Sequence, residues 1–137
     1  MATMKILNLK KPDETRPFAS KGRAEIFHLE DGTVGRAFFE PGWKWSECVK
    51  PIAGTKTCEV AHLGVCLSGR MRVRMNDGTE AEMGPGDVMQ IDPGHDAWVV
   101  GNETCVVLDF GGMEHYAERP AERGRGAGPE PSRPGAH

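Results

Sequence analysis

The stretch from Gly69 to Gly94 reads GRMRVRMNDGTEAEMGPGDVMQIDPG and is the most regular part of the chain. Polar and apolar residues alternate along it in short runs, with the period of two that is typical of a half-buried strand. Asn-Asp-Gly, Gly-Pro-Gly and Asp-Pro-Gly separate the runs, and such triplets supply the backbone conformations that tight turns need. The three strands predicted here are Arg70–Met75, Thr79–Met83 and Asp87–Ile91. The stretch therefore predicts antiparallel hairpins.

The same kind of pattern continues on both sides of this stretch. No sustained helical period occurs between residues 23 and 110. Short strands joined by Gly, Pro and Asn are typical of an antiparallel sandwich or barrel, so the predicted fold class is all-β. The further predicted strands are Arg23–Leu29, Thr33–Glu40, Val60–Leu67, Ala97–Val100 and Thr104–Phe110.

Length and charge narrow the class of protein. A chain of 137 residues predicts one domain, and a net charge of −3 lacks the one-sided basic field that nucleic-acid binding needs. The arginines at 70, 72 and 74 alternate with apolar residues, which indicates the solvated face of a strand. No run of about 18 apolar residues occurs, and residues 1–11 do not resemble a secretory signal. We therefore expect a cytoplasmic protein without a nucleic-acid or membrane partner.

Three segments are expected. Residues 1–22 form an N-terminal arm, in which Lys5–Leu9 is predicted to be an edge or swapped strand. Residues 23–116 form the β domain, and residues 117–137 form a disordered tail, because Ala, Glu, Arg, Gly and Pro leave almost nothing there to bury. His115 and His137 are therefore weak site candidates. Within the domain, Trp43–Thr57 is a long connection, and connections of this length are often functional.

Two stretches resemble the two motifs of the cupin superfamily. Gly84–Gly94 is similar to the second motif, with its Pro-Gly-Asp unit followed by a Pro-x-Gly turn, and His62–Gly69 resembles the closing half of the first. The resemblance implies a jelly-roll β-barrel, also called a double-stranded β-helix, and a homodimer. It does not specify a reaction, because cupins include isomerases, dioxygenases, decarboxylases, epimerases, storage proteins and sensor domains.

The resemblance also implies a metal site, but with substituted ligands. Cupins supply a His-x-His pair and a Glu from the first motif, and these positions hold Cys48, Lys50 and His62 here. The second-motif His falls at Ala97, with His95 just before it in the same turn. We therefore expect Cys48, His62 and His95 to bind a divalent transition metal (Zn, Fe, Ni or Mn). Asp96, Glu47 or Cys58 is the expected fourth ligand or support.

Strand geometry refines this expectation. On Val60–Leu67, His62 shares a face with Gly64 and Cys66, and the opposite face is uniformly apolar and is predicted to pack in the core. A regular strand places Cys58 about 13 Å from His62, so Cys58 joins the site only if the chain bends between them. The alternative, a buried structural thiol, is favoured for Cys58. Cys66 and Cys105 are predicted to be core residues.

Other side chains are expected to line a pocket in the barrel. The candidates for this lining are Trp43, Trp45, Lys50, Gln90 and Trp98. Tryptophans in a long connection can hold a flat or apolar ligand at the barrel mouth, or they can form a hydrophobic plug or a dimer contact. A solvated position is the alternative for the lysine.

The sequence leaves three functions open. The first is a metal-dependent enzyme, dioxygenase- or isomerase-like, whose ion binds a small oxygen-bearing substrate. The second is a non-catalytic module that binds or senses a small molecule in the same pocket. The third is a metal-free enzyme that uses His62 and a carboxylate as base and acid. The substrate itself is not specified by the sequence.

Overall fold

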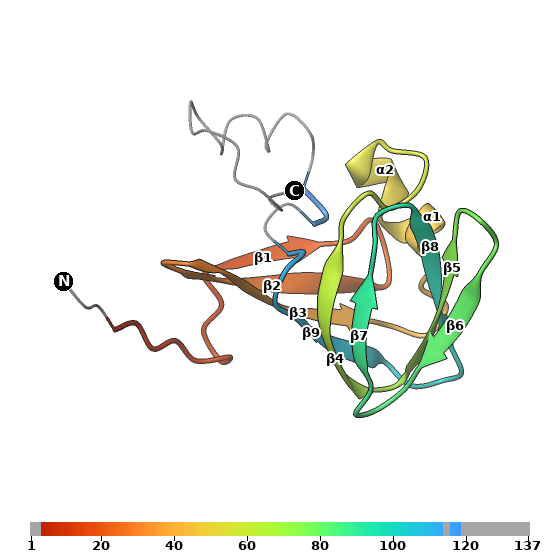
Figure 1. Cartoon of the computed structure of the whole chain (residues 1–137). Coiled ribbons are helices and arrows are strands. Elements are labelled where there is room, and N and C mark those ends of the chain that lie inside the picture. Colours follow the sequence, from red (N-terminus) through yellow and green to blue (C-terminus); the bar gives the residue numbers. More distant parts are fainter. Residues whose placement is uncertain (1–3, 114–115, 119–137) are drawn as a thin grey trace.

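The computed structural model describes residues 4–113 and 116–118, and this part of the chain forms two antiparallel sheets that face each other (Figure 1). The larger sheet has the order β1-β2-β3-β9-β4-β7, and the smaller has the order β6-β5-β8. The larger sheet consists of β1 Glu14–Pro17, β2 Gly22–Leu29, β3 Gly32–Phe39, β9 Cys105–Asp109, β4 His62–Ser68 and β7 Val88–Ile91. The smaller sheet consists of β6 Glu80–Met83, β5 Arg70–Met75 and β8 His95–Val100. The prediction of an all-β antiparallel fold is confirmed.

Two short helices were not expected. The connection after β3, predicted only as a long segment from Trp43 to Thr57, contains α1 (Trp45–Cys48) and α2 (Lys50–Ala53). Each helix is a single turn, too short to show a helical period in the sequence. Gly54 ends α2 with a left-handed conformation (φ 74°), as glycine commonly does at helix ends.

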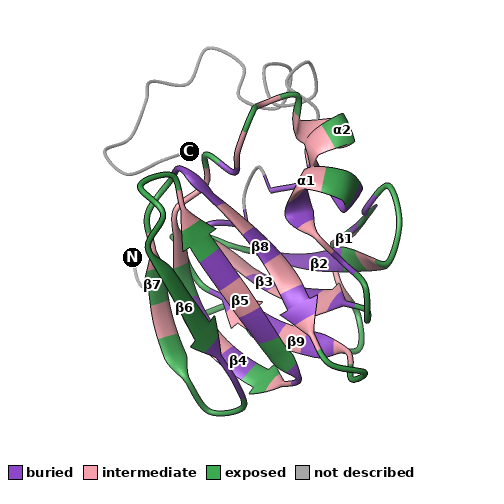
Figure 2. Cartoon of the chain, turned by 90° about the vertical axis from the view of Figure 1, so that its right-hand side faces the viewer, coloured by how far each residue is buried: buried purple, intermediate pink, exposed green. Residues whose placement is uncertain are grey.

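The central hairpin of β5 and β6 forms as predicted. Met71 on β5 pairs with Met83 on β6, and both are buried between the sheets. Arg70 and Arg72 point outward and form ion pairs with Glu82 and Glu80 at 2.8 and 2.7 Å. This arrangement confirms that the alternating arginines form a solvated face. Figure 2 shows the resulting alternation of buried and more exposed residues along β5 and β8.

The prediction for the two faces of β4 was wrong in one respect. Gly64 and Cys66 are buried on the inward face with His62, whereas Leu63 and Leu67 on the apolar face are 50% and 46% exposed. Alternation shows that two faces differ, but it does not show which face is inside. The inward face packs tightly, because a Cβ on Gly64 would collide with the backbone carbonyl of Leu108 on β9.

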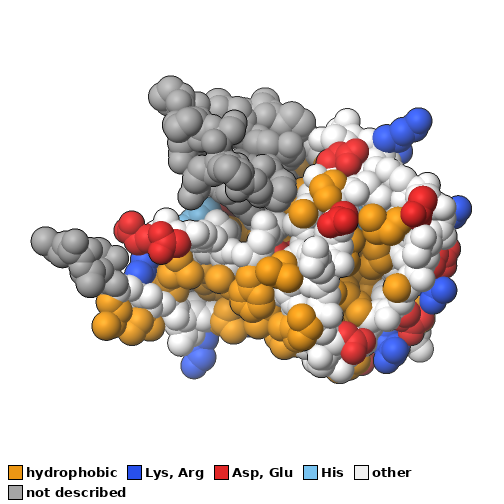
Figure 3. All heavy atoms as spheres, viewed as in Figure 1, with side chains coloured by type: hydrophobic (Ala, Val, Ile, Leu, Met, Phe, Trp, Pro, Cys, Tyr) orange, Lys and Arg blue, Asp and Glu red, His pale blue; other side chains and the backbone are white. Residues whose placement is uncertain are grey.

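The apolar face of β4 continues across the outside of the larger sheet. Val88 on β7 is 79% exposed and Phe110 after β9 is 50% exposed, so this face is open within one chain. Figure 3 shows hydrophobic side chains gathered on this side of the molecule. Large exposed apolar patches commonly mark interaction surfaces.

The predictions for the two ends of the chain either differ from the structure or concern residues that the structure does not describe. Lys5–Leu9 forms no strand within the described chain, and the edge of the larger sheet is β1 instead. Of the predicted tail, only Ala117 and Glu118 lie within the described residues, and Ala117 is buried. His115 and His137 lie outside them. No helix in the described part of the chain is long and apolar enough to span a membrane.

Candidate metal centre

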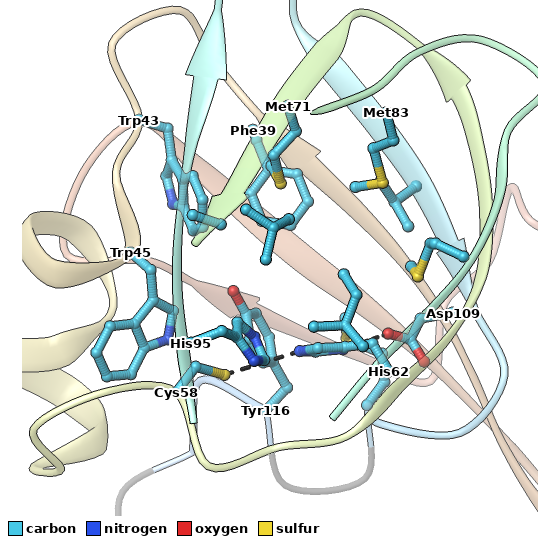
Figure 4. A pocket seen from close by; sticks show the side chains of 16 residues that line it. Phe39, Trp43, Trp45, Cys58, His62, Met71, Met83, His95, Asp109 and Tyr116 are labelled. Carbon is cyan, nitrogen blue, oxygen red and sulfur yellow. Dashed lines mark hydrogen bonds and ion pairs between the residues drawn. The ribbon is translucent and has the colours of Figure 1, made fainter. Parts of the chain in front are cut away.

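Three potential metal ligands converge at one end of the space between the sheets. Cys58 precedes β4, His62 begins β4 and His95 begins β8, and their ligand atoms all lie within 4.8 Å of one another (Figure 4). Three backbone hydrogen bonds tie the first segment to the last: Cys58 N–H donates to His95 O (2.8 Å), and the N–H groups of Gly94 (2.7 Å) and His95 (3.3 Å) donate to Cys58 O. Backbone pairing therefore holds Cys58 beside His95.

Cys58 reaches His62 because the chain bends between them. The residues from 59 to 61 are not part of a strand, and Cys58 Sγ lies 3.7 Å from His62 Nε2. A straight strand would separate the two residues by about 13 Å. The condition for Cys58 to join the site is thus met, although the spacing favoured a purely structural thiol.

Both histidine rings are fixed through Nδ1. His62 Nδ1 lies 2.5 Å from Asp109 Oδ2, and His95 Nδ1 lies 2.8 Å from the carbonyl oxygen of Asp92. An acceptor at Nδ1 places the proton of a neutral imidazole there and leaves the Nε2 lone pair free. Metal-ligating histidines in proteins are commonly held in this way by a carboxylate or carbonyl.

Asp109 is an internal support for this site. Its carboxylate is fully buried on β9, and its Oδ1 accepts hydrogen bonds from Gly111 N–H (3.0 Å) and Gly112 N–H (2.8 Å). Burial alone would raise the pKa of Asp109, but the hydrogen bond from His62 and the two backbone donors hold this pKa below its usual value. Asp109 is therefore an ionised carboxylate at the back of His62.

Cys58 and His62 stabilise each other's charged forms. Burial acts against ionisation of both groups, yet the hydrogen bond from His62 lowers the pKa of Cys58 to about 6. The hydrogen bonds to Asp109 and Cys58 raise the pKa of His62 to about 9. Without a metal ion, the two side chains consequently form a thiolate–imidazolium pair near neutral pH.

An apolar cavity of about 40 Å³ adjoins the cluster. Its ionisable lining near the cluster comes from Cys58, His62, His95 and Asp109. The remaining lining residues are Phe39, Trp43, Trp45, Met71, Val73, Met83, Met89, Ile91, Ala97, Val107, Met113 and Tyr116. Four methionines among them make the lining adaptable.

The segment after β9 closes one side of the cavity. Arg16 on β1 is 8% exposed, and its Nη1 donates hydrogen bonds to the carbonyl oxygens of Met113 (3.0 Å) and Tyr116 (2.8 Å). The Tyr116 ring packs edge-on against His62, with 5.4 Å between ring centroids. Burial raises the pKa of Tyr116 well above its usual value, so its hydroxyl stays protonated.

The structure does not bring the other proposed ligands into this cluster. Cys48 lies in α1, where its Sγ contacts Ser20 Oγ at 3.3 Å, and Glu47 is exposed. Asp96 points to the face of β8 opposite His95, and its Oδ1 accepts hydrogen bonds from Ser46 N–H (3.2 Å) and Ala97 N–H (2.9 Å).

The expected pocket lining is found in part. Trp43 and Trp45 line the cavity, and each is 2% exposed. Lys50, Gln90 and Trp98 do not line it. The pleat explains two of these positions: Met89 and Ile91 point inward on β7 while Gln90 is exposed, and Trp98 lies on the outer face of β8 with Lys44 Nζ 5.7 Å from its ring.

Sequence reasoning missed Asp109, Tyr116 and Arg16. Asp109 is the sole acidic residue in the predicted strand Thr104–Phe110, and Gly111 and Gly112 follow soon after it. A charged residue inside an apolar strand is rarely buried without a partner, and this was an available signal. Tyr116 and Arg16 carried no comparable signal, because their contacts join the two ends of the domain.

Comparison with known proteins identifies the fold. No protein-family model and no curated protein sequence matches the chain. An RmlC-like cupin from Shewanella frigidimarina superposes with a TM-score of 0.55 at 10% identity, covering 82% of this chain and 95% of that one. A Cupin 2 conserved barrel domain protein from Salinispora arenicola gives 0.54 at 16% identity, covering 80% and 88%. KdgF from Halomonas sp. gives 0.54 at 13% identity, covering 88% and 99%. Likeness at these identities shows the fold alone.

Proposed function

Since this chain has the cupin fold, a double-stranded β-helix, we propose that it binds a divalent transition metal through Cys58, His62 and His95 and presents it to a small molecule in the adjoining cavity. The observation that carries the proposal is that each imidazole is fixed through Nδ1, which frees its Nε2 for a metal. Of the ligands expected from the sequence, His62 and His95 are kept, and Cys58 replaces Cys48.

The geometry of the three side chains fits an ion. Tetrahedral ligands at about 2.0 Å for nitrogen and 2.3 Å for sulfur lie roughly 3.5 Å apart. Cys58 Sγ and His62 Nε2 are separated by 3.7 Å, so the pair is close to a ligating separation. One thiolate with two imidazoles suits zinc or iron among the divalent ions expected.

Three protein ligands would leave one coordination position for a ligand. Catalytic zinc sites keep such an open position, whereas structural sites are closed by a fourth protein ligand. The bound ion would supply Lewis acidity to a group in that position. The chain's own contribution is to hold the His62 proton at Nδ1 through Asp109 and to keep water out with an apolar lining. This favours an enzyme, and a non-catalytic sensing module is the alternative.

A second candidate uses the same residues without a metal. His62 lies between the other two side chains: its Nε2 is 3.7 Å from Cys58 Sγ, and its Nδ1 is 2.5 Å from Asp109 Oδ2. This is the order of a nucleophile, a base and a carboxylate that orients the base. This arrangement supports the metal-free acid–base alternative, with Asp109 as its carboxylate. His95 separates the candidates, because it is a ligand in the first and lies outside the contacts that define the second.

The test is the metal content of protein purified without chelator or His-tag, measured by mass spectrometry. We expect near-stoichiometric metal in the wild type, and its loss in His62→Ala, His95→Ala and Cys58→Ser. His28→Ala and Cys48→Ser are matched controls, since His28 is exposed on β2 and Cys48 lies in α1, and both should retain metal. Metal-free wild type, even after reconstitution, would refute the metal proposal.

We also propose that a second copy of the chain covers the apolar outer face of β4, β7 and β9. Leu63, Leu67, Val88 and Phe110 support this proposal, because they are 50%, 46%, 79% and 50% exposed on one side of the larger sheet. Light scattering after size exclusion should give a dimer that Leu67→Lys dissociates. Thr79→Lys, at an exposed residue between β5 and β6 in the smaller sheet, should remain dimeric. A monomeric wild type would contradict this assignment.

A further inference from the structure

The cavity beside the three ligands is lined by no lysine or arginine. Apart from Cys58, His62, His95 and Asp109, every residue in its lining is aliphatic, aromatic or methionine. A substrate carboxylate or phosphate in this cavity would find no lysine or arginine to pair with. Burying an unpaired charge in apolar surroundings is strongly unfavourable.

The proposed metal does not give the site a net positive charge. A divalent ion brings two positive charges, and the Cys58 thiolate and the buried Asp109 carboxylate bring two negative charges. With neutral imidazoles at His62 and His95 the centre is formally uncharged, so a neutral ligand completes it without leaving a net charge in the core. This balance rests on the proposed function.

A groove beside the cavity is lined by carboxylates. Val73, Met83, Met89 and Ile91 line both the cavity and this outer groove of about 650 Å³ between β6 and β7. The charged residues that line the groove are Glu80, Glu82, Asp87 and Asp92, and no lysine or arginine lines it. Glu80 and Glu82 are paired with Arg72 and Arg70, so the negative charge of the groove comes mainly from Asp87 and Asp92.

One hydroxyl in the cavity is free to bind a ligand. Tyr116 is 3% exposed, and within the described residues its Oη has no hydrogen-bond partner. Figure 4 shows the ring passing beside His62 and His95, with the hydroxyl turned toward the middle of the lining side chains. Among the described residues, the one fully buried side-chain polar atom without a hydrogen-bond partner is Trp43 Nε1, which belongs to the same lining, so a ligand that accepts from Trp43 Nε1 or Tyr116 Oη would fill a vacant hydrogen bond.

We infer that the molecule bound at this site is small, uncharged and mostly apolar, and that its single polar group lies between the metal and the hydroxyl of Tyr116. Tyr116 donates a hydrogen bond to that group and orients it, while the methionine-rich lining adapts to the apolar body. The same lining disfavours carboxylates and phosphates, because it holds no lysine or arginine, and it disfavours sugars, because it offers too few hydrogen-bonding groups.

Fluorine NMR with three small probes tests this inference. The probes are fluoroacetamide, which is neutral with an acceptor, fluoroacetate, which is anionic, and fluoroethane, which has no polar group to accept from the tyrosine. Each is smaller than a benzene ring, as a cavity of about 40 Å³ requires. We expect the amide to bind at least tenfold more tightly than the acid. We expect Tyr116→Phe to weaken amide binding by about fivefold, the effect of one neutral hydrogen bond, and to leave fluoroethane binding unchanged.

Each outcome has one meaning. Equal binding of amide and acid, an equal loss of all three probes in Tyr116→Phe, or no binding of any probe overturns the inference. Retained fluoroethane binding shows that the variant keeps its cavity, so a folding defect cannot imitate the expected result. Metal content is measured on the same samples. Metal-free wild type that still discriminates among the probes refutes the metal proposal and leaves the ligand class standing.

Discussion

Replacing Asp109 with Asn is the sharpest perturbation of the proposed centre, because it removes one charge at constant size. The carboxylate receives three hydrogen bonds, from His62 Nδ1 and from the backbone N–H groups of Gly111 and Gly112. An amide oxygen can still accept the two backbone bonds, which leaves the amide –NH₂ facing His62. That group donates, so the imidazole must present a lone pair at Nδ1 and carry its proton at Nε2.

A proton at Nε2 occupies the position that the metal needs. Loss of such supporting carboxylates typically weakens metal binding 10- to 100-fold, which corresponds to about 1.4–2.7 kcal/mol. We expect a loss in this range for Asp109→Asn, measured by competition with a chromophoric chelator. The spectrum of a cobalt-substituted sample should also shift, because the orientation of His62 changes.

The control keeps the same chemistry outside the site. Asp96→Asn alters a carboxylate on the outward face of β8, one residue from His95, and should bind metal like the wild type. If Asp109→Asn retains wild-type affinity while remaining folded, His62 does not depend on its carboxylate partner and the reasoning fails. If both variants lose metal equally, the loss results from removing one negative charge and not from losing the hydrogen bond to His62.

Three further predictions concern pH, the Arg16 contacts and sheet packing. The pKa of His62 is raised to about 9 and that of Cys58 is lowered to about 6. Between pH 6 and 9 a binding ion therefore displaces one proton, from His62, and below about pH 6 it also displaces the Cys58 proton. Chelator competition across pH should therefore show affinity falling as pH drops, more steeply below 6; a flat profile would exclude these two ligands. Arg16→Met removes two charge-assisted hydrogen bonds to the carbonyls of Met113 and Tyr116 and should cost roughly 2–4 kcal/mol in urea unfolding, whereas Arg74→Met at an exposed position should change little. Gly64→Ala drives a Cβ into the carbonyl of Leu108 and should cost several times more than Gly32→Ala, where a Cβ meets open space; equal thermal shifts would count against the tight β4–β9 contact.

The strands were predictable because their signals are local. Alternation and turn triplets over Arg70–Ile91 specify the hairpins from neighbouring residues alone. The inward orientation of β4 was not, because a strand with two different faces does not reveal which sheet lies beneath it. The exposed apolar face of Leu63 and Leu67 shows the cost of assuming that the more apolar side is the core.

The membership of the site depends on long-range contacts that spacing cannot show. Cys58 was set aside because a straight strand takes it far from His62, and the bend that brings it back is held by backbone hydrogen bonds to residues 94 and 95. Cys48 occupied the expected position by counting along the chain, but a single helical turn there carries its thiol to Ser20.

The histidine of the second motif shows how far a resemblance can be carried. Counting placed it at Ala97, whereas the chain supplies His95, two residues earlier on β8. Because side chains on a strand alternate with a period of two, a shift of two residues keeps a side chain on the same face. His95 and Ala97 are both buried on the inward side, while Asp96 between them points outward. A side chain two positions earlier on the strand can thus face the same cavity. This is why the ring of His95 contacts His62, whereas the carboxylate of Asp96, although closer in number to position 97, does not.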